Sequence, residues 1–280
     1  IKREKLLKFF KYLVSYAFLG LLAFFMLVPF YWMIATSLKT EAEIELAIPT
    51  FYPHLLALSN YPQAIERLNA GRLIFNTVWV GVWSTLGTLI TTVFAAFAFS
   101  RLNFKGKDTL FTIFLATMMI PGEIFVITNY TTIASWDMKN TFPALVLPFI
   151  VSVFYIFFLR QTFRQIPNEL YLAAKVDGTG DFKYLWKVLL PICKPTIITI
   201  TILTVIECWN SYVWPRLITD DSAYFLVSNG IQEIRESGFG RENIPAMMAA
   251  VVVVSVPLVV IFLFFRNRIM EGVATGGMKG

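Results

Sequence analysis

Long stretches without charged side chains constrain this chain more than any other feature. Four stretches are free of charged residues, and two more are each interrupted by one glutamate, Glu123 or Glu207. An α-helix needs roughly 20 apolar residues to cross about 30 Å of hydrocarbon. With 57% apolar and only 15% charged residues, the chain has too little polar surface for a soluble domain of 280 residues. The sequence therefore predicts an all-α membrane protein, one transmembrane domain over residues 1–280, with six transmembrane helices near residues 12–35, 73–100, 109–136, 140–160, 191–216 and 243–266.

The distribution of lysine and arginine predicts the orientation of these helices. Basic residues in short flanking segments are retained on the cytoplasmic side of a membrane. Of the 24 basic residues, five lie in the N-terminal tail, three after the second span, six between the fourth and fifth spans and three in the C-terminal tail. The opposite side holds seven. We therefore expect both termini in the cytoplasm, and we attribute the net charge of +6 to membrane topology rather than to nucleic-acid binding.

The patterns of common catalytic and nucleotide-binding sites are missing from the sequence. A phosphate-binding loop G-x-x-x-x-G-K-[ST] is absent, because Gly106-Lys107 is followed by Asp108. The single histidine, His54, is expected to be a solvated residue of an external loop, and no Cys/His cluster has the spacing of zinc ligands. We therefore expect that the chain is not an enzyme and binds no metal or cofactor itself.

The loop between the fourth and fifth spans, residues 161–190, carries helical patterns of its own. Pro167-Asn168 predicts the start of a first helix, with Asn168 as its cap and Glu169 in its first turn. The sequence Asp177-Gly178-Thr179-Gly180 predicts its end. Asp181 is then predicted to cap a second helix. Four residues at i, i+3, i+4 and i+7 form the apolar face of that helix: Phe182, Leu185, Trp186 and Leu189.

Two alanines at the centre of the first helix, Ala173 and Ala174, offer a small surface that another protein can approach closely. The glycine turn would hold this helix at a fixed angle to the second. These features favour a docking element for a partner protein. The alternative is an amphipathic helix that lies on the bilayer, which would carry bulky apolar residues in its middle. The acidic residues Glu169 and Asp177 weigh against that alternative.

The loop resembles the EAA coupling loop of ABC importer permeases. The resemblance rests on the sequence IPNELYLAAKVDG at residues 166–178, followed by Leu190-Pro191. Further motifs resemble the maltose-permease type of the carbohydrate-uptake branch and cover nearly the whole chain: Asn76-Thr77, RLNFKG at 101–106, Ile120-Pro121, Asn140-Thr141, FLRQ at 158–161, Trp209-Asn210 and Pro257. The whole chain also resembles the permease of an alginate-oligosaccharide importer, although no single residue separates an acidic from a neutral sugar.

The resemblance implies a permease subunit that forms half of the translocation pathway for a sugar or oligosaccharide in a bacterial inner membrane. The implied partners are a second permease subunit, two ATP-binding subunits that hold ATP and Mg²⁺, and an extracytoplasmic solute-binding protein. Leu172 stands where the family carries the acid of the EAA name, and Glu169, three residues earlier on the same helix face, could replace that acid. The implied docking residues are Glu169, Leu172, Ala173, Ala174, Asp177 and Gly178.

Two glutamates within the predicted spans are expected to face the bundle interior or water, because a charge at the bilayer centre is costly. Glu123 and Glu207 are therefore candidates for the substrate pathway. Glu123 could instead serve the break at Pro121-Gly122, and Glu207 could bond to a neighbouring helix. The fifth span adds aromatic and amide groups suited to a sugar ring, unless the tryptophan is an interfacial anchor: Trp209, Asn210 and Tyr212.

A secondary transporter or a channel subunit is the alternative function. A secondary transporter would show interrupted spans and ionisable relays in corresponding halves, and the sequence shows none. A channel has no use for the alanine pair and glycine turn. The glycine-rich end, residues 272–280, is predicted to be irregular, and the resemblance implies that it can reach between the ATP-binding subunits.

Overall fold

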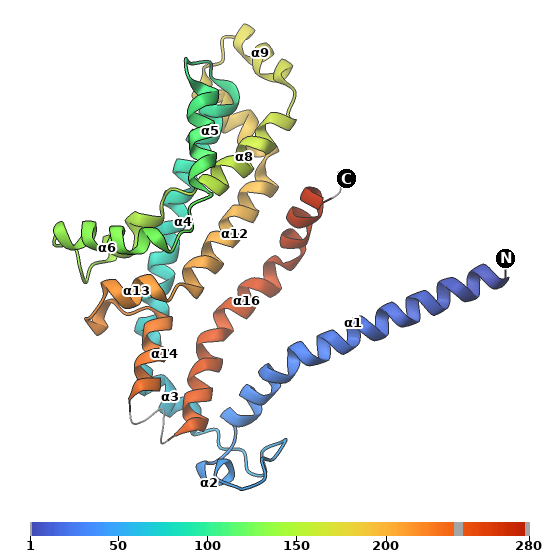
Figure 1. The fold of residues 1–280 in the computed structure, drawn as a ribbon, viewed down its shortest axis with the longest axis vertical. Coiled ribbons are helices and arrows are strands. Elements are labelled where there is room, and N and C mark those ends of the chain that lie inside the picture. The colour runs from blue at the N-terminus through green and yellow to red at the C-terminus, as the bar shows by residue number, and fades with distance from the viewer. Residues whose placement is uncertain (1, 238–242, 278–280) are drawn as a thin grey trace. The chain divides into compact units, whose positions relative to one another are not determined.

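The computed structural model describes residues 2–237 and 243–277, and every regular element among them is a helix (Figure 1). This confirms the all-α class for the described part of the chain. Three helical segments in it are long and apolar enough to cross a membrane: Phe9–Ser37, Ala70–Arg101 and Ile244–Arg266. Two bent helix pairs bring the number to five if each pair is one span. The count of six spans stays a prediction.

The chain forms two compact units. Unit 1 comprises Ile1–Ala70 and Ile231–Val256, and unit 2 comprises Gly71–Gly230 and Pro257–Gly280. Unit 1 contains α1 (Lys2–Ser37), α2 (Glu41–Ile44) and α3 (Asn60–Leu68). Between Phe9 and Tyr31, α1 exposes its side chains on every side. A helix that is apolar all round has this pattern when lipid surrounds it.

The segment between α1 and α3 folds back on the end of α1. The Asn60 side-chain amide donates to the backbone oxygens of Ser37 and Lys39, at 2.9 and 2.8 Å. Glu43 accepts hydrogen bonds from the Thr50 hydroxyl at 2.6 Å and from the backbone N–H of His54 at 3.2 Å. The His54 side chain is exposed, as the sequence predicts.

Unit 2 contains most of the remaining helices. In chain order these are α4 (Ala70–Arg101), α5 (Lys107–Thr117), α6 (Ile124–Ser135), α7 (Phe142–Val146), η1 (Leu147–Phe149), α8 (Val153–Gln165), α9 (Asn168–Val176), α10 (Asp181–Tyr184), the π-helical η2 (Leu185–Leu189), α11 (Leu190–Ile192), α12 (Lys194–Asn210), α13 (Val213–Ile218) and η3 (Ser222–Tyr224). The helices α14 (Val227–Glu236) and α16 (Ile244–Gly277) have residues in both units. The predicted irregular tail is helical as far as Gly277, and residues 278–280 lie outside the described part.

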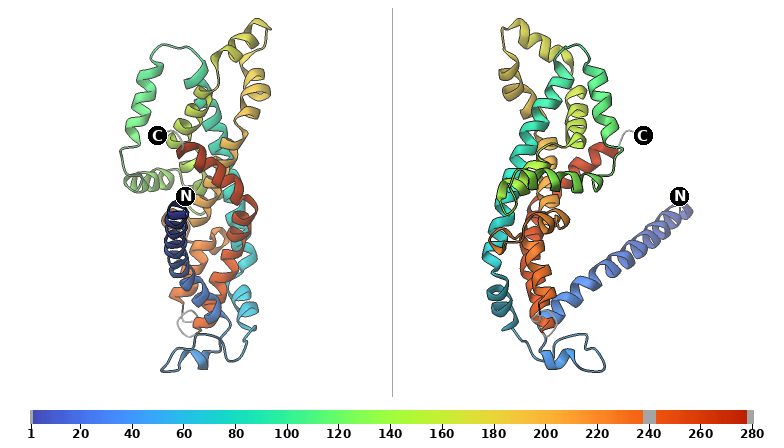
Figure 2. Two further views of the ribbon diagram at one scale, coloured as in Figure 1. Left: turned by 90° about the vertical axis from the view of Figure 1, so that its right-hand side faces the viewer. Right: turned by 60° about the vertical axis from the view of Figure 1, so that its left-hand side comes forward.

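Three predicted spans are broken in the structure. The segment 109–136 is divided at Pro121-Gly122 into α5 and α6, and α6 runs across the direction of α5 in each view (Figure 2). In the fourth predicted span, the segment Phe142–Phe149 meets α8 at 49°. The fifth is α12, which meets the segment Asp181–Ile192 at 81°. A proline at or near each break removes a backbone donor and favours the bend.

The core of unit 2 reaches into the loop 161–190. Phe163 on α8, Tyr184 on α10 and Leu189 on η2 are completely buried, in one cluster with Leu159 and Ile200. The loop is therefore anchored to the helices rather than hanging from them, and α9 lies at the end of unit 2 where α4 leads into α5 (Figure 1).

Candidate functional site

The helix α9 has no buried residue, and one of its faces is an exposed stripe. We define this stripe as Glu169, Leu172, Ala173 and Val176, which follow each other at i, i+3, i+4 and i+7. Leu172 is 55% exposed and Val176 is 87% exposed. The stripe is thus apolar at its centre and acidic at its start, with a small alanine between two larger side chains. A surface of this kind is suited to the groove of another protein.

The paired alanines differ in environment. Ala173 is exposed on the stripe, whereas Ala174 is partly buried and packs on the apolar core of unit 2 with Tyr171. The sequence placed both alanines on a docking surface without distinguishing them. The structure shows that only Ala173 is freely accessible, while Ala174 holds the opposite face of α9 against the bundle.

The glycine turn ends α9 by a defined motif. Gly178 has a φ of 71°, in the left-handed region. The N–H of Gly178 donates to the oxygen of Lys175 at 3.0 Å, and the N–H of Thr179 donates to the oxygen of Ala174 at 2.8 Å. This pair of bonds is a Schellman motif, which satisfies the last carbonyls of a helix. The predicted helix end at Asp177 and Gly178 is therefore confirmed.

The start of α9 differs from the prediction. Asn168 is the first helical residue and Pro167 occupies the cap position, with no side-chain cap bond. The side-chain oxygen Oδ1 of Asn168 instead accepts a bond of 3.4 Å from Nη1 of Arg101, the last residue of α4. The prediction of Asn168 as the cap was wrong. Asn168 is itself the first helical residue, and its side chain accepts a hydrogen bond from the buried Arg101 instead. Glu169 does lie in the first turn, as predicted.

Asp181 joins α9 to α10 in place of its predicted role as a cap. Gly180 occupies the cap position of α10. The Asp181 carboxylate accepts from the Tyr171 hydroxyl at 2.6 Å and pairs with Lys175 Nζ at 2.6 Å. The Lys175 and Tyr171 bonds hold the pKa of Asp181 below its usual range, and the Asp181 bond raises the pKa of Lys175. Burial, followed by the bond to Asp181, raises the pKa of Tyr171.

The second predicted helix has a different inner face. Leu185 and Leu189 are buried, as predicted, but Phe182 and Trp186 are 64% and 53% exposed. The π-helical turn Leu185–Leu189 adds a residue to the turn and changes which side chains share a face. Tyr184, which the predicted apolar face omits, is completely buried in their place.

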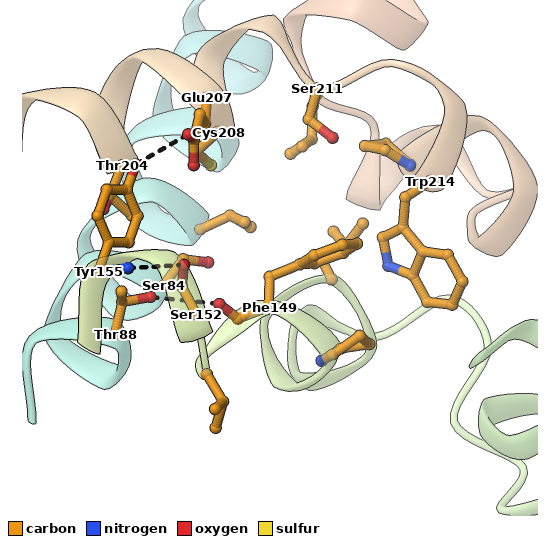
Figure 3. Close-up of a pocket in the computed structure, with 16 residues that line it drawn as sticks. Ser84, Thr88, Phe149, Ser152, Tyr155, Thr204, Glu207, Cys208, Ser211 and Trp214 are labelled. Atoms are coloured by element: carbon orange, nitrogen blue, oxygen red, sulfur yellow. Dashed lines mark hydrogen bonds between the residues drawn. The ribbon is translucent and has the colours of Figure 1, made fainter. Parts of the chain in front are cut away.

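Unit 2 contains a cavity of about 370 Å³ (Figure 3). Its wall comes from α4, the η1–α8 bend, α12 and α13. Hydroxyl groups of Ser84, Thr88 and Ser152 lie on one side, and the rings of Phe149 and Trp214 lie on another. These two rings meet edge to face, with centroids 5.8 Å apart. Aromatic faces combined with a few polar groups are typical of small-molecule sites.

Glu207 is the acidic residue of the cavity wall. Its Oε1 accepts a bond of 2.8 Å from the Tyr155 hydroxyl on α8. This bond links α12 to α8, which is the helix-to-helix alternative that the sequence left open, and it also holds the carboxylate at the cavity. The predicted pathway role of Glu207 and its structural role are therefore compatible.

The other predicted pathway residues lie outside this cavity. Glu123 is exposed at the start of α6, directly after the Pro121-Gly122 break. Trp209 is buried, while Asn210 and Tyr212 are exposed. Residues that do line the cavity were missed, because Ser84, Thr88 and Tyr155 look like ordinary members of apolar spans in the sequence. Trp209 and Asn210 lie on α12 near this cavity without lining it, and the tryptophan of the wall is Trp214 on α13.

A profile of one protein family matches most of the chain. The family is described as binding-protein-dependent transport system inner membrane component, and the match covers residues 87–273. This range contains α9, its glycine turn, and almost all of the cavity wall.

Curated relatives extend the similarity over nearly the full length. The chain is 31% identical to the sulfoquinovosyl glycerol transport system permease protein SmoH of Agrobacterium fabrum, over 91% of this chain and 89% of that protein. It is 28% identical to the arabinooligosaccharides transport system permease protein AraQ of Halalkalibacterium halodurans, over 95% of each. A crystal structure of a bacterial ABC transporter involved in the import of the acidic polysaccharide alginate contains a chain with a TM-score of 0.81 and 21% identity, over 91% of this chain and 95% of that one. This last likeness shows a shared fold.

Proposed function

Because the chain belongs to the family of binding-protein-dependent transport system inner membrane components, we propose that it forms half of the translocation pathway for a sugar or an oligosaccharide. As a member of that family it is a permease subunit of a binding-protein-dependent ABC importer. The sugar cargo rests on the relatives, which include permeases of sulfoquinovosyl glycerol and arabinooligosaccharide transport systems. The alternatives of a secondary transporter and a channel are not favoured by any of these matches.

The proposed complex contains partners that the family implies. These are a second permease subunit, two ATP-binding subunits that hold ATP and Mg²⁺, and an extracytoplasmic solute-binding protein. We propose a bacterial inner membrane location, with both termini and the loop 161–190 in the cytoplasm. The chain's own contribution is then mechanical, because it links movement of an ATP-binding subunit to movement of the membrane helices.

The observation that carries this proposal is the exposed stripe on a helix that is fixed to the bundle at both ends. Arg101 binds the chain just before α9, and Asp181 binds two side chains of α9 from the following helix. A force applied to the stripe would therefore be transmitted to α4, α8 and α10 through these bonds, because α9 is not attached by a flexible loop alone. Glu169 lies on the same stripe as Leu172, which supports the idea that it replaces the acid absent at Leu172.

In this proposal, the cavity lined by Glu207 and Trp214 holds part of the sugar. Its volume of about 370 Å³ lies within the usual range for small-molecule sites. A carboxylate and three hydroxyls can bond to sugar hydroxyls, and Trp214 can cover an apolar face of the ring. Glu207 would bind a neutral sugar more readily than an acidic one, because two like charges repel each other.

The substitution Ala173→Arg tests the docking role on an exposed residue. We expect the complex with this variant to lose substrate-stimulated ATP hydrolysis and co-purification of the ATP-binding subunits, because a long charged side chain would hold the two surfaces apart. Lys183→Ala, on an exposed residue of α10 outside the stripe, is the control and should leave both unchanged. Full stimulation with Ala173→Arg would exclude docking through this stripe.

A further inference from the structure

A second cavity of unit 2, of about 480 Å³, lies where α4 passes into α5 beside the end of α8. It is separate from the cavity that holds Glu207, since the two share no lining residue. Its wall consists of the last turn of α4, the loop that leads to α5, the first turn of α5 with Lys107 and Asp108, and two arginines of α8, Arg160 and Arg164.

The charged groups of this wall are strongly unbalanced. Among the described residues that line the cavity, three are basic and one is acidic. The acid, Asp108, has a side chain that is 94% exposed, and its oxygen is 4.0 Å from Nη2 of Arg160, at the limit of an ion pair. Burial, followed by repulsion from Arg160, lowers the pKa of Lys107. The positive charge of the cavity wall therefore exceeds the negative charge that Asp108 supplies.

Arg160 is built into the wall rather than free to leave it. Its side chain is only 7% exposed, its Nε donates to the backbone oxygen of Phe99 at 3.0 Å, and its guanidinium lies 3.8 Å from the centre of the Phe111 ring. The guanidinium is thus held in a fixed position beside the cavity, and its charge is largely removed from water. A fixed arginine of this kind is the usual partner of a phosphate or carboxylate.

The first turn of α5 adds further attraction for an anion. Gly106 caps this helix with no side-chain bond, so the first backbone N–H groups of α5 have no cap from that residue. Helix N-termini favour negative charge, and the first turn of α5 carries one acid, the largely exposed Asp108, and one base, Lys107. An anion in the cavity would offset both the helix end and the lysine.

From these features we infer that the cavity binds a phosphate group, which the headgroup of an anionic phospholipid supplies. Phe104 and Leu110 are 41% and 46% exposed, and Leu110 follows Lys107 by three residues on α5, so the Lys107 and Leu110 side chains lie on the same side of the helix. An acyl chain can lie on this apolar surface while the phosphate remains among the basic groups. The cavity lies at the end of unit 2 that carries α9, where interfacial headgroups would be found if that end faces the cytoplasm.

Lipid retention by the intact importer tests this inference. The purified complex is titrated with phosphatidylglycerol or phosphatidylcholine in detergent, and bound lipid is counted by native mass spectrometry. The first variant is Arg164→Gln, because Arg164 is exposed and its loss does not disturb the core; Lys107→Gln is the second. The matched control is Lys105→Gln. Lys105 is an exposed residue of the loop that leads to α5, and it does not line the cavity.

We expect the wild type and Lys105→Gln to retain phosphatidylglycerol equally and in preference to phosphatidylcholine. Each cavity variant should need about fivefold more phosphatidylglycerol for the same retention. Asp108→Asn should retain it more tightly, since the competing acid is removed. Inorganic phosphate is tested with the same variants. If it binds and is weakened by the same substitutions while no lipid is retained, the cavity is a phosphate site whose phosphate comes from solution rather than from a lipid. Equal retention of phosphatidylglycerol by wild type, Arg164→Gln and Lys107→Gln would overturn the inference.

Discussion

Arg101, the last residue of α4, donates a hydrogen bond of 2.8 Å from Nη2 to the backbone oxygen of Ile166, which caps the end of α8 two residues before α9 begins. The same nitrogen donates to the oxygen of Phe163 at 2.7 Å, and the residue is 8% exposed. These carbonyls lie at the end of α8, where a positive charge also meets the negative end of the helix dipole. A displacement of α9 is therefore shared by α8 and α4 at once.

Replacement of Arg101 should uncouple α9 from the membrane helices. In Arg101→Met the carbonyls of Phe163 and Ile166 lose a charged donor, and each such bond stabilises by about 1.5–3 kcal/mol. We expect substrate-stimulated ATP hydrolysis in proteoliposomes to fall at least about tenfold, with the protein still inserted in the membrane. Lys105→Met, on an exposed residue nearby, is the control. Wild-type stimulation in Arg101→Met would show that the bonds to α8 carry no coupling.

The two glycines of the turn after α9 offer a matched pair. A methyl group at Gly178 or at Gly180 would meet no atom within 4 Å, so packing is unaffected at either position. Only Gly178 has a positive φ, of 71°, whereas Gly180 has a φ of −69°. An L-residue in the left-handed region costs about 1–2 kcal/mol. We expect Gly178→Ala to raise hydrogen exchange at the end of α9 about fivefold or more, and Gly180→Ala to leave it unchanged.

Much of the loop 161–190 could be predicted because its signals are local. The start near Asn168 and the end at Gly178 depend on backbone preferences of residues adjacent in sequence. The cap by Asn168 could not be predicted correctly, because Arg101 competes for that side chain from 67 residues away. The prediction of the inner face of the second helix was wrong for a related reason. The π-helical turn Leu185–Leu189 has no sequence signal, and it changes the spacing at which side chains share one face of the helix.

The cavity was harder to predict than the loop. Glu207 was found because a lone charge in an apolar stretch is conspicuous, but Ser84 and Tyr155 have no such contrast with their neighbours. Their shared role arises only when α4, α8 and α12 pack together. The sequence predicts the third span, residues 109–136, as one transmembrane segment that bends at Pro121-Gly122. Composition alone could not show that α6 takes a different direction from α5.

The bonds of Asp181 predict a pH dependence of the loop. Its pKa is lowered in the folded state from an ordinary value of 3.8, so the stabilisation is present above that value and is lost as the pH falls through the folded pKa. The pKa of Lys175 is raised from 10.5, so its contribution is complete below that value and is lost as the pH rises through the folded pKa. We expect constant protection of α9 between these limits.

Hydrogen exchange of α9 at several pH values, corrected for intrinsic rates, checks this expectation. Wild-type protection should fall only below the ordinary aspartate pKa of 3.8, and the loss should continue until Asp181 has taken up a proton at its lower folded pKa. Asp181→Asn should show lower protection that changes little over the same acid range. An acid-dependent loss of equal size in Asp181→Asn would assign the pH dependence to another group.

The bond between Tyr155 and Glu207 allows the two roles of Glu207 to be separated. Glu207→Gln keeps an oxygen that can accept from Tyr155 and removes only the charge, whereas Tyr155→Phe removes the donor and keeps the carboxylate. A group that binds sugar should be sensitive to its charge, because a hydrogen bond to a charged group is stronger than one to a neutral group. We therefore expect Glu207→Gln to raise the KM for sugar uptake about tenfold.

Uptake of labelled sugar by proteoliposomes measures this effect, and Glu123→Gln is the control, since the exposed Glu123 lies outside the cavity. That control should transport with the wild-type KM. A purely structural Glu207 gives the opposite pattern, in which Glu207→Gln transports normally and Tyr155→Phe lowers thermal stability, because only the latter breaks the link between α8 and α12. Such a pattern would remove Glu207 from the translocation pathway and leave it as a helix-packing residue.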